Sequence, residues 1–370
     1  MTADLSLMGV IRREIELRGS IPFARFMELA LYHPTHGYYC AEGGQIGREG
    51  DFITSVAVGP VFGGFLAMQF AEMWERMGRP KPFTLLELGS HRGWLAEDVL
   101  AWARQRRPDF ADAVEYWICD SNAASVSPVS TQRKSFTTWY DIPNWSVVGC
   151  IFSNELVDAL PVHRIRRTSP SEWKEFYVTF GERGWVWELG PPSFSIDCLP
   201  LTLREFPYPP GYMTEVHLAA LDWVREMARI LKRGFLLTID YGYTEAEYYA
   251  PHRPNGTLRC YHRHEVNTEP LERVGEQDIT AHVNFGALIT QGIPLGLDFT
   301  GLIDQSRFLM GIGQDEIERI VNARPGQPDK ARRQLQMLLN PADMGRAFKV
   351  LIQHKGVDAP RLSGLRYARG

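Results

Sequence analysis

The sequence of 370 residues predicts an α/β protein built on a Rossmann-like, doubly wound parallel sheet with helices on both faces. Two observations carry this prediction. First, residues 83–88 form a short apolar run that ends in a glycine turn, and a helical pattern follows over 94–107. Second, similar runs recur at 114–120, 147–153 and 235–243, and the first and last end in an acid. Short apolar runs with turn signals at their ends, separated by helical patterns, are typical of βαβ units.

Composition excludes several classes of protein. The chain is 44% hydrophobic and 23% charged, with a formal net charge of −4, so we expect neither nucleic acid nor membrane as a partner. Five scattered cysteines without a Cys-x-x-Cys pair favour a reduced setting, with neither a disulfide framework nor a metal site. The first residues lack a secretory or transit pattern, which predicts a cytoplasmic protein.

The N-terminal 80 residues are expected to form a helical segment and a covering loop. Helical periodicity runs over residues 5–32, with a second helix opening near Pro22, and again over 61–77. Between them, residues 50–55 place an acid and two hydroxyls just before a helix. Thr54 or Ser55 could cap that helix or contact a ligand, and the pattern does not separate the two roles.

The turn after residues 83–88 is the first candidate site. A glycine turn at Gly89 leaves backbone N–H groups and a helix N-terminus at the crevice above the sheet, where doubly wound folds bind nucleotides. Asp120, at the end of the second strand, is placed to accept hydrogen bonds from ribose hydroxyls. An ordinary β–α turn followed by a surface carboxylate is the competing interpretation.

A second group of polar residues follows the strand at 147–153. Asn154, Glu155 and Asp158 fall where a parallel strand ends, at the ligand side of an open sheet. Asn154 and Asp158 would share one face of a helical turn, although Asn154 could equally serve as a helix N-cap.

The remaining chain divides into an insertion and the second half of the sheet. We predict domain segments 81–162, 163–213 and 214–370, the middle one a β-rich insertion with a hairpin turn at 181–184. A helix is expected at 215–232 and a half-buried strand at 275–285 that carries Asp278, Thr280, His282 and Asn284 on one face. Further helices near 315–323 and 329–339 and a strand at 347–353 complete the prediction, whereas the third strand, between 129 and 140, has no clear pattern.

Eight short motifs occur together in one order that resembles a known family. They are residues 37–39, 50–55, 86–89, 154–163, 240–243, 256–258, 278–283 and 344–350. The chain resembles the MidA-like S-adenosylmethionine-dependent methyltransferases, which include the mitochondrial complex I assembly-factor protein arginine methyltransferase. Each motif is weak alone, but their order covers residues 20–356.

The resemblance implies a class I methyltransferase sheet, S-adenosylmethionine as cofactor, and a role for each candidate residue. The cofactor turn would be formed by Glu87, Gly89, Ser90 and Gly93, with Asp120 on the ribose. The loop at Asp51, Thr54 and Ser55 would close over the methionine end of the cofactor. Asn154, Glu155 and Asp158 would face the reacting centre, with Asn154 on the cofactor side.

The chain departs from the family at the turn itself, where His91 replaces the usual middle glycine and crowds the closest backbone approach unless the loop shifts or φ stays negative. Two acceptors remain open, a protein arginine and a small metabolite. Glu155 and Asp158 would hold a guanidinium bidentately, and His282 or His163 would serve as base for a hydroxyl or acid. A homodimer is an open alternative to a monomer.

Two other classes compete with the methyltransferase interpretation. His91 supports a non-catalytic assembly or binding module, although the retained polar strand ends argue against it. A nicotinamide-dependent oxidoreductase is disfavoured because the turn lacks the Gly-x-Gly-x-x-Gly spacing that lets a pyrophosphate approach.

Overall fold

The structure is a computed structural model that describes residues 6–40, 55–121, 133–182, 184–263, 265–322, 330–340 and 344–368. The chain forms two compact units, each assembled from three separate segments. Unit 1 comprises Met1–Ile53, Val157–Asp222 and Tyr243–Ala287, and unit 2 comprises Thr54–Leu156, Trp223–Gly242 and Leu288–Gly370. The segment boundaries expected at residues 80, 162 and 213 remain a prediction.

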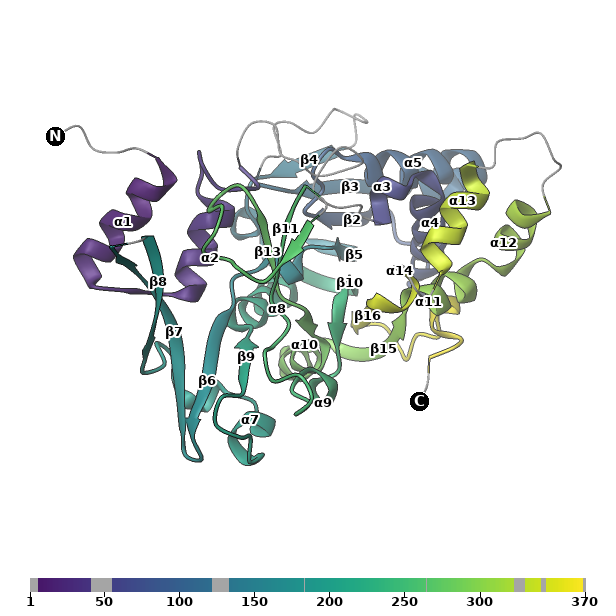
Figure 1. The fold of residues 1–370 in the computed structure, drawn as a ribbon. Coiled ribbons are helices and arrows are strands. Elements are labelled where there is room, and N and C mark those ends of the chain that lie inside the picture. Colours follow the sequence, from purple (N-terminus) through teal and green to yellow (C-terminus); the bar gives the residue numbers. More distant parts are fainter. Residues whose placement is uncertain are drawn as a thin grey trace. The chain divides into compact units, whose positions relative to one another are not determined.

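Unit 2 contains the predicted sheet, whose strands run in the order β4-β3-β2-β5-β10-β16-β15 (Figure 1). Its strands are β2 (Phe83–Leu88), β3 (Val114–Cys119), β4 (Arg133–Phe136), β5 (Val147–Asn154), β10 (Leu231–Tyr243), β15 (Asp298–Asp304) and β16 (Phe348–Lys355). The first five are parallel, and β16 is antiparallel to both of its neighbours. Consequently β15 runs in the same direction as β10, and both end at the edge where the parallel strands end.

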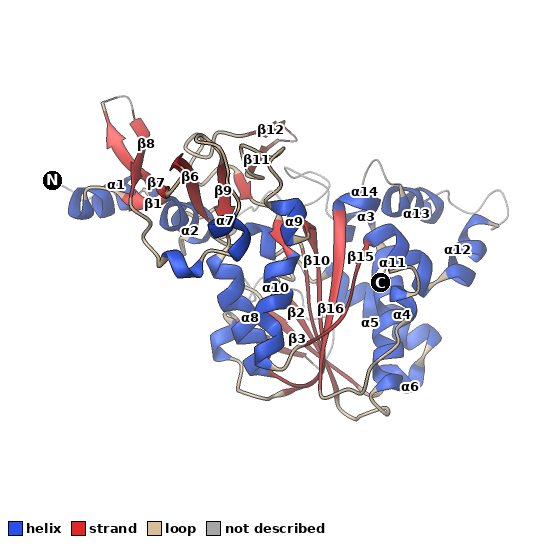
Figure 2. Ribbon diagram, turned by 90° about the horizontal axis from the view of Figure 1, so that it is seen from below, coloured by secondary structure: helices blue, strands red, loops and turns tan. Residues whose placement is uncertain are grey.

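Helices cover both faces of this sheet, with α4 and α5 on one side and α8 on the other (Figure 2). The helices of unit 2 are α3 (Ser55–Val58), α4 (Pro60–Arg76), α5 (Trp94–Arg106), α6 (Pro108–Ala111), α8 (Leu218–Ile230, from Trp223 on), α10 (Phe285–Gly292, from Leu288 on), α11 (Gln305–Ile312), α12 (Gln314–Val321), α13 (Lys330–Leu339) and α14 (Met344–Ala347). All six residues of β2 are buried, as expected for a central strand with both faces covered.

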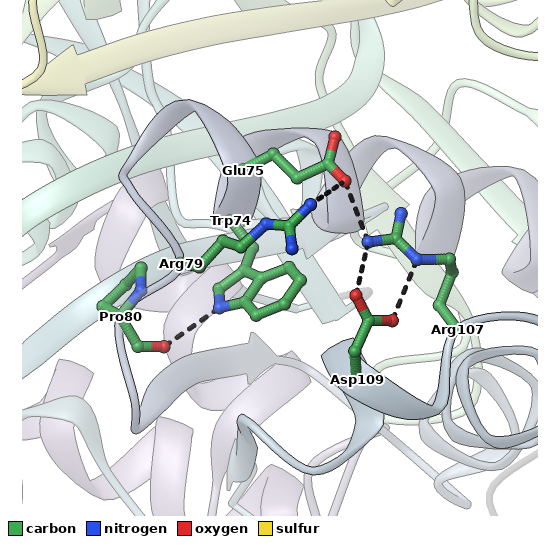
Figure 3. Close-up of polar contacts among 6 residues, drawn as sticks. All are labelled: Trp74, Glu75, Arg79, Pro80, Arg107 and Asp109. Atoms are coloured by element: carbon green, nitrogen blue, oxygen red, sulfur yellow. Dashed lines mark hydrogen bonds and ion pairs between the residues drawn. The ribbon is translucent and has the colours of Figure 1, made fainter.

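An ion-pair cluster connects the ends of α4, α5 and α6 (Figure 3). Glu75 accepts hydrogen bonds from Arg107 at 2.8 Å and from Arg79 at 3.5 Å. Arg107, directly after α5, also donates twice to Asp109 of α6, at 3.0 and 2.9 Å. The hydrogen bond to Asp109, then that to Glu75 and the charges of both acids, raise the pKa of Arg107, so the charged guanidinium joins the three helix ends.

Unit 1 is built on two antiparallel sheets. The first has the order β1-β7-β6-β9, with β8 also paired to β7, and the second the order β12-β11-β13. Strands are β1 (Ile21–Pro22), β6 (His163–Ser169), β7 (Glu172–Gly181), β8 (Gly184–Gly190), β9 (Met213–Val216), β11 (Arg259–His262), β12 (Glu265–Asn267) and β13 (Asp278–Thr280). Helices α1 (Leu7–Arg18), α2 (Phe23–Tyr32), α7 (Leu201–Glu205) and α9 (Glu245–Tyr248) accompany them. The predicted hairpin is present, with Gly181 opposite Gly184.

Two predicted elements are wrong in part. The helix expected at 215–232 is instead β9 followed by α8, because Glu215 is fully buried in a strand where it pairs with Arg164 of β6. The strand expected at 275–285 stops after Thr280 and resumes only at β14 (Val283–Asn284), and α10 begins at Phe285. Ala281 turns away from the sheet to donate its N–H to the carbonyl of Asp158 at 2.9 Å, so Asp278 and His282 do not belong to one continuous strand.

The last segment contains more structure than its sequence pattern indicates. The helices near 315–323 and 329–339 correspond to α12 and α13, and the final strand to β16. By contrast, β15 and α11 were missed, and the unplaced third strand is the four-residue β4, parallel to β3. Within the described part of the chain, no helix combines the length and apolar character needed to cross a bilayer.

Candidate functional site

The turn after β2 has the backbone conformation of a ligand-binding loop. Gly89 and Gly93 both have positive φ, 72° and 77°. A Cβ on Gly89 would lie 3.0 Å from the Leu156 side chain, so glycine lets this turn approach the end of β5 closely. Glu87 is buried beneath the turn, where its carboxylate accepts a hydrogen bond of 2.6 Å from the Tyr116 hydroxyl of β3.

His91 adopts a left-handed backbone conformation with a φ of 48°, so the negative φ that was one way to avoid crowding does not occur. Histidine is among the non-glycine residues enriched in this region. Its backbone N–H donates to an Asp120 carboxylate oxygen at 2.8 Å. The left-handed turn therefore fixes the carboxylate that was predicted to hold the ribose.

Ser55, Asn154 and Glu155 are brought together at the end of β5. One Glu155 carboxylate oxygen accepts hydrogen bonds from the Ser55 N–H and the Asn154 side-chain amide, each at 2.9 Å. Glu155 itself has a φ of 53°, and its N–H donates to the Ile239 carbonyl at 2.9 Å. Positive φ in a non-glycine residue is sparsely populated and clusters at functional sites.

Two of the buried polar atoms at this edge that have no hydrogen-bond partner among the described residues lie beside the glycine turn or at the end of β5. They are the hydroxyl oxygen of Ser90, in the glycine turn, and the side-chain oxygen of Asn154. Buried polar atoms are rarely left unpaired in native proteins, so each is a candidate contact for a bound ligand. The open glycine turn, the fixed Asp120 and these two atoms fit an adenosine carrying a polar amino-acid end.

Unit 1 contains two buried acids, Asp158 in the short 3-10 helix η3 (Val157–Ala159) and Asp278 in β13. The Tyr39 hydroxyl donates to Asp278 at 2.6 Å. Burial, with the charges of Asp278, Tyr32 and Asp158, raises the pKa of Tyr39 well above its usual value. Burial and both carboxylates also raise the pKa of Tyr261, so the two acids share one neighbourhood.

His282 lies in the same unit and is neutral at pH 7. Burial, then the charges of Arg259 and Arg253, lowers its pKa to about 4. The backbone N–H of His282 donates to the Thr257 hydroxyl at 3.1 Å, and the imidazole ring packs against Tyr243. His163, the other candidate base, instead forms a 2.7 Å contact with the buried Glu175 of the neighbouring strand β7.

Not every predicted site residue can be placed together. Asp51 and Thr54 lie outside the described residues. Glu155 belongs to unit 2, whereas Asp158 and His282 belong to unit 1, so the predicted catalytic set stays a prediction. Within the described residues, no group of three or more histidine, cysteine, aspartate or glutamate side chains could hold a metal ion.

The sequence interpretation missed Gln305, the first residue of α11, because β15 was not recognised. Gln305 is fully buried, and its side-chain oxygen accepts a hydrogen bond of 3.3 Å from the Ser55 hydroxyl. The sequence pattern that points to Gln305 is the run at 298–304, because it ends in an acid and is followed by a polar residue, as the strand at 147–154 is followed by Glu155.

A mostly parallel sheet with one reversed strand, a glycine turn after β2 and an acid after β3 define a class I methyltransferase fold. A family model described as "Putative S-adenosyl-L-methionine-dependent methyltransferase" matches residues 65–303. The chain belongs to this family, and the predicted MidA-like resemblance, methyltransferase activity and S-adenosylmethionine cofactor are confirmed.

Relatives agree over nearly the whole chain. The mitochondrial protein arginine methyltransferase NDUFAF7 homolog of Drosophila melanogaster is 28% identical over 96% of this chain and 86% of its own length. Human NDUFAF7, also named a mitochondrial protein arginine methyltransferase, is 28% identical over 96% of this chain and 84% of its own. A solved superfamily member from Burkholderia thailandensis, bound to S-adenosyl-homocysteine, is 30% identical with a TM-score of 0.87, covering 98% of this chain and 95% of that one.

Proposed function

We propose that this methyltransferase acts on the guanidinium of a protein arginine. Its support is the likeness, over 96% of the chain, to relatives named protein arginine methyltransferases, together with the paired acids of unit 1. Two buried carboxylates in one neighbourhood repel each other, and a cation that contacts both relieves this repulsion. A guanidinium suits the task because its planar donors form bidentate hydrogen bonds with carboxylates.

Each group has a distinct task in this proposal. Bound S-adenosylmethionine supplies a methyl group that its sulfonium already activates. Within unit 2, Ser90, Asp120 and Asn154 bind the cofactor. Within unit 1, Asp158 and Asp278 offer two carboxylates to a guanidinium. Neutral His282 adds no positive charge that would repel the acceptor.

We also propose a cytoplasmic location for this chain, whereas its relatives are named as mitochondrial.

The experiment supplies the purified protein with S-adenosylmethionine labelled in its methyl group. Acceptors are an arginine-containing peptide library, the same library with lysine in place of arginine, and a panel of phenols and carboxylic acids. We expect label only in the arginine library and methylarginine after acid hydrolysis. Label in the small molecules alone, from protein that binds S-adenosylhomocysteine, would instead assign a metabolite acceptor.

Asp278→Asn tests the acidic pair directly. Loss of one carboxylate from a buried guanidinium contact should lower methyl transfer roughly 100-fold while the S-adenosylhomocysteine Kd stays unchanged. Glu182→Gln, at an exposed acid in the same unit, is the control and should transfer at the wild-type rate. Equal activity of Asp278→Asn and wild type would remove Asp278 from the acceptor site.

A further inference from the structure

Gln305 stands out in unit 2 because a fully buried side chain offers an unpaired donor at the ligand edge of the sheet. Its side-chain nitrogen is buried and has no hydrogen-bond partner among the described residues. Since β15 runs parallel to β10, Gln305 begins α11 at the edge where β2, β5 and β10 also end. Ligands bind at this edge in open α/β sheets.

A short chain of hydrogen bonds connects Gln305 to the polar residues at the end of β5. The Ser55 hydroxyl donates to the Gln305 oxygen at 3.3 Å, and the Ser55 N–H donates to Glu155 at 2.9 Å. Asn154 donates to the same Glu155 oxygen, which leaves the Asn154 side-chain oxygen buried and unpaired. This series of hydrogen bonds therefore has an unpaired acceptor, the Asn154 oxygen, at one end and an unpaired donor, the Gln305 nitrogen, at the other.

We propose that Gln305 and Asn154 together bind the amino-acid end of S-adenosylmethionine. The Asn154 oxygen accepts from the ammonium group, and the Gln305 nitrogen donates to the carboxylate. A zwitterion requires both an acceptor and a donor, and hydrogen bonds to charged groups are the strong ones. This assignment of Gln305 rests on the cofactor-binding function stated above and adds a residue to it.

Position distinguishes Gln305 from Gln353, another buried glutamine with an unpaired amide. Gln353, in β16, lies opposite Leu236, midway along β10, and opposite Phe299, near the start of β15. Through β10 and β5 it is level with Leu86 in the middle of β2, so it lies inside the sheet and not at the edge where the glycine turn begins. Gln353 offers a matched control, because the same substitution there changes a buried amide remote from the ligand.

Isothermal calorimetry of Gln305→Glu tests the proposal with two ligands. Glutamate keeps the oxygen that accepts from Ser55 but places an acceptor where the donor was, so it should repel a carboxylate. We expect S-adenosylhomocysteine to bind about 10- to 100-fold more weakly. Methylthioadenosine, which lacks the amino-acid end, should bind within about twofold of its wild-type affinity.

Controls keep the outcome interpretable. Gln305→Met removes the donor without adding repulsion, so it should weaken the binding of S-adenosylhomocysteine less than Gln305→Glu does. Gln353→Glu should change the affinity for neither ligand. Unchanged S-adenosylhomocysteine affinity in Gln305→Glu overturns the proposal, and so does an equal loss for both ligands. Wild-type protein that binds neither ligand would overturn the cofactor function itself, an outcome separate from the role of Gln305.

Discussion

His91 shows at the scale of one residue how this turn differs from an all-glycine loop. A left-handed φ costs a residue with a Cβ roughly 1–2 kcal/mol, and the imidazole stands beside the Trp94 ring. The cost is tolerated because the backbone N–H of His91 holds Asp120. That hydrogen bond needs only the backbone, so a glycine would preserve it.

Replacing His91 with Gly should therefore tighten binding of S-adenosylhomocysteine several-fold, by about 0.5–1 kcal/mol, because the side chain no longer limits the approach of the ligand. Calorimetry measures this directly, and His91→Ala separates the Cβ from the ring. Weaker binding by both variants would mean that the imidazole itself contacts the cofactor.

Gly256 is the second residue whose identity the structure explains. It has a φ of 72°, and a Cβ there would lie 2.2 Å from one carboxylate oxygen of the fully buried Glu215. The other oxygen of Glu215 accepts from the N–H of Thr257 at 2.8 Å and its hydroxyl at 3.1 Å. Thr257 in turn accepts from the N–H of His282, so this glycine permits the packing beneath the His282 loop.

Gly256→Ala should lower the free energy of unfolding by about 3 kcal/mol or more, because both strain and a clash with a buried carboxylate oppose it. Urea denaturation gives the value. Gly211→Ala is the matched control in the same unit, since φ is also positive at 96° but no atom lies within 4 Å of the added Cβ. It should cost only about 1–2 kcal/mol, and equal losses would refute the clash with Glu215.

At the scale of single residues, the sequence indicated which polar residues lie at strand ends but not which residues they bond to. Glu87, Asp120, Asn154 and Glu155 were found because each follows or ends an apolar run, which is local information. That Tyr116 binds Glu87 and Ser55 binds Glu155 depends on strand pairing and on contacts across 29 and 100 positions. Periodicity carries no information about such distant partners.

Among the secondary-structure elements, the junction of β15, α11 and β16 determines where Gln305 lies. Asp304 ends β15 and precedes α11, and it forms an ion pair with Lys349, directly opposite on β16. Arg307, in the first turn of α11, lies 3.7 Å from the same carboxylate. The pair is mostly buried, with side-chain exposures of 18% and 23%, so it is shielded from solvent more than a surface ion pair.

Lys349→Met should destabilise the fold by roughly 2–3 kcal/mol, because it leaves Asp304 mostly buried without its lysine. Adding Asp304→Asn should restore part of that loss. Denaturant unfolding of the two single variants and the double variant forms a cycle. Additive losses would show that the two side chains do not interact, and Arg307→Gln should have a smaller effect than Lys349→Met.

The central elements were predictable because each buried strand or amphipathic helix repeats its pattern over many residues. Where the prediction failed, burial of a polar side chain overrode the local pattern. Glu215 continues the helical pattern of its neighbours, yet β9 holds it opposite Arg164. Likewise, the alternation at 278–284 is that of one strand, but the hydrogen bond from Ala281 to Asp158 interrupts it.

For the molecule as a whole, two buried histidines make the fold sensitive to acid. Burial lowers the pKa of His217 to about 4, and burial with nearby arginines does the same for His282, from an ordinary value of 6.5. Between these values the unfolded chain binds more protons than the folded one. The free energy of unfolding must therefore fall as the pH is lowered from 7 to 5.

Each histidine should contribute on the order of 2 kcal/mol to this fall. Urea unfolding at pH 7 and pH 5 measures it. His217→Gln, whose amide nitrogen can replace Nε2 as the donor to the Leu160 carbonyl, should reduce the difference between the two pH values, whereas His252→Gln, at an exposed position, should not. An unchanged difference in His217→Gln would mean that His217 is not the titrating group.

The division of each unit among three chain segments has a consequence for synthesis. Ile21 in β1 pairs with Val178 in β7, so the N-terminal helices pair with a strand that is made 157 residues later. At ~10 residues per second this delay is roughly 16 s, during which the apolar face with Ile11, Phe23 and Phe26 lacks the rest of its core. The last segment of unit 1 ends at Ala287, so this unit cannot be complete until 287 of the 370 residues have been made, and shielding of its first helices until then would lower the risk of misfolding.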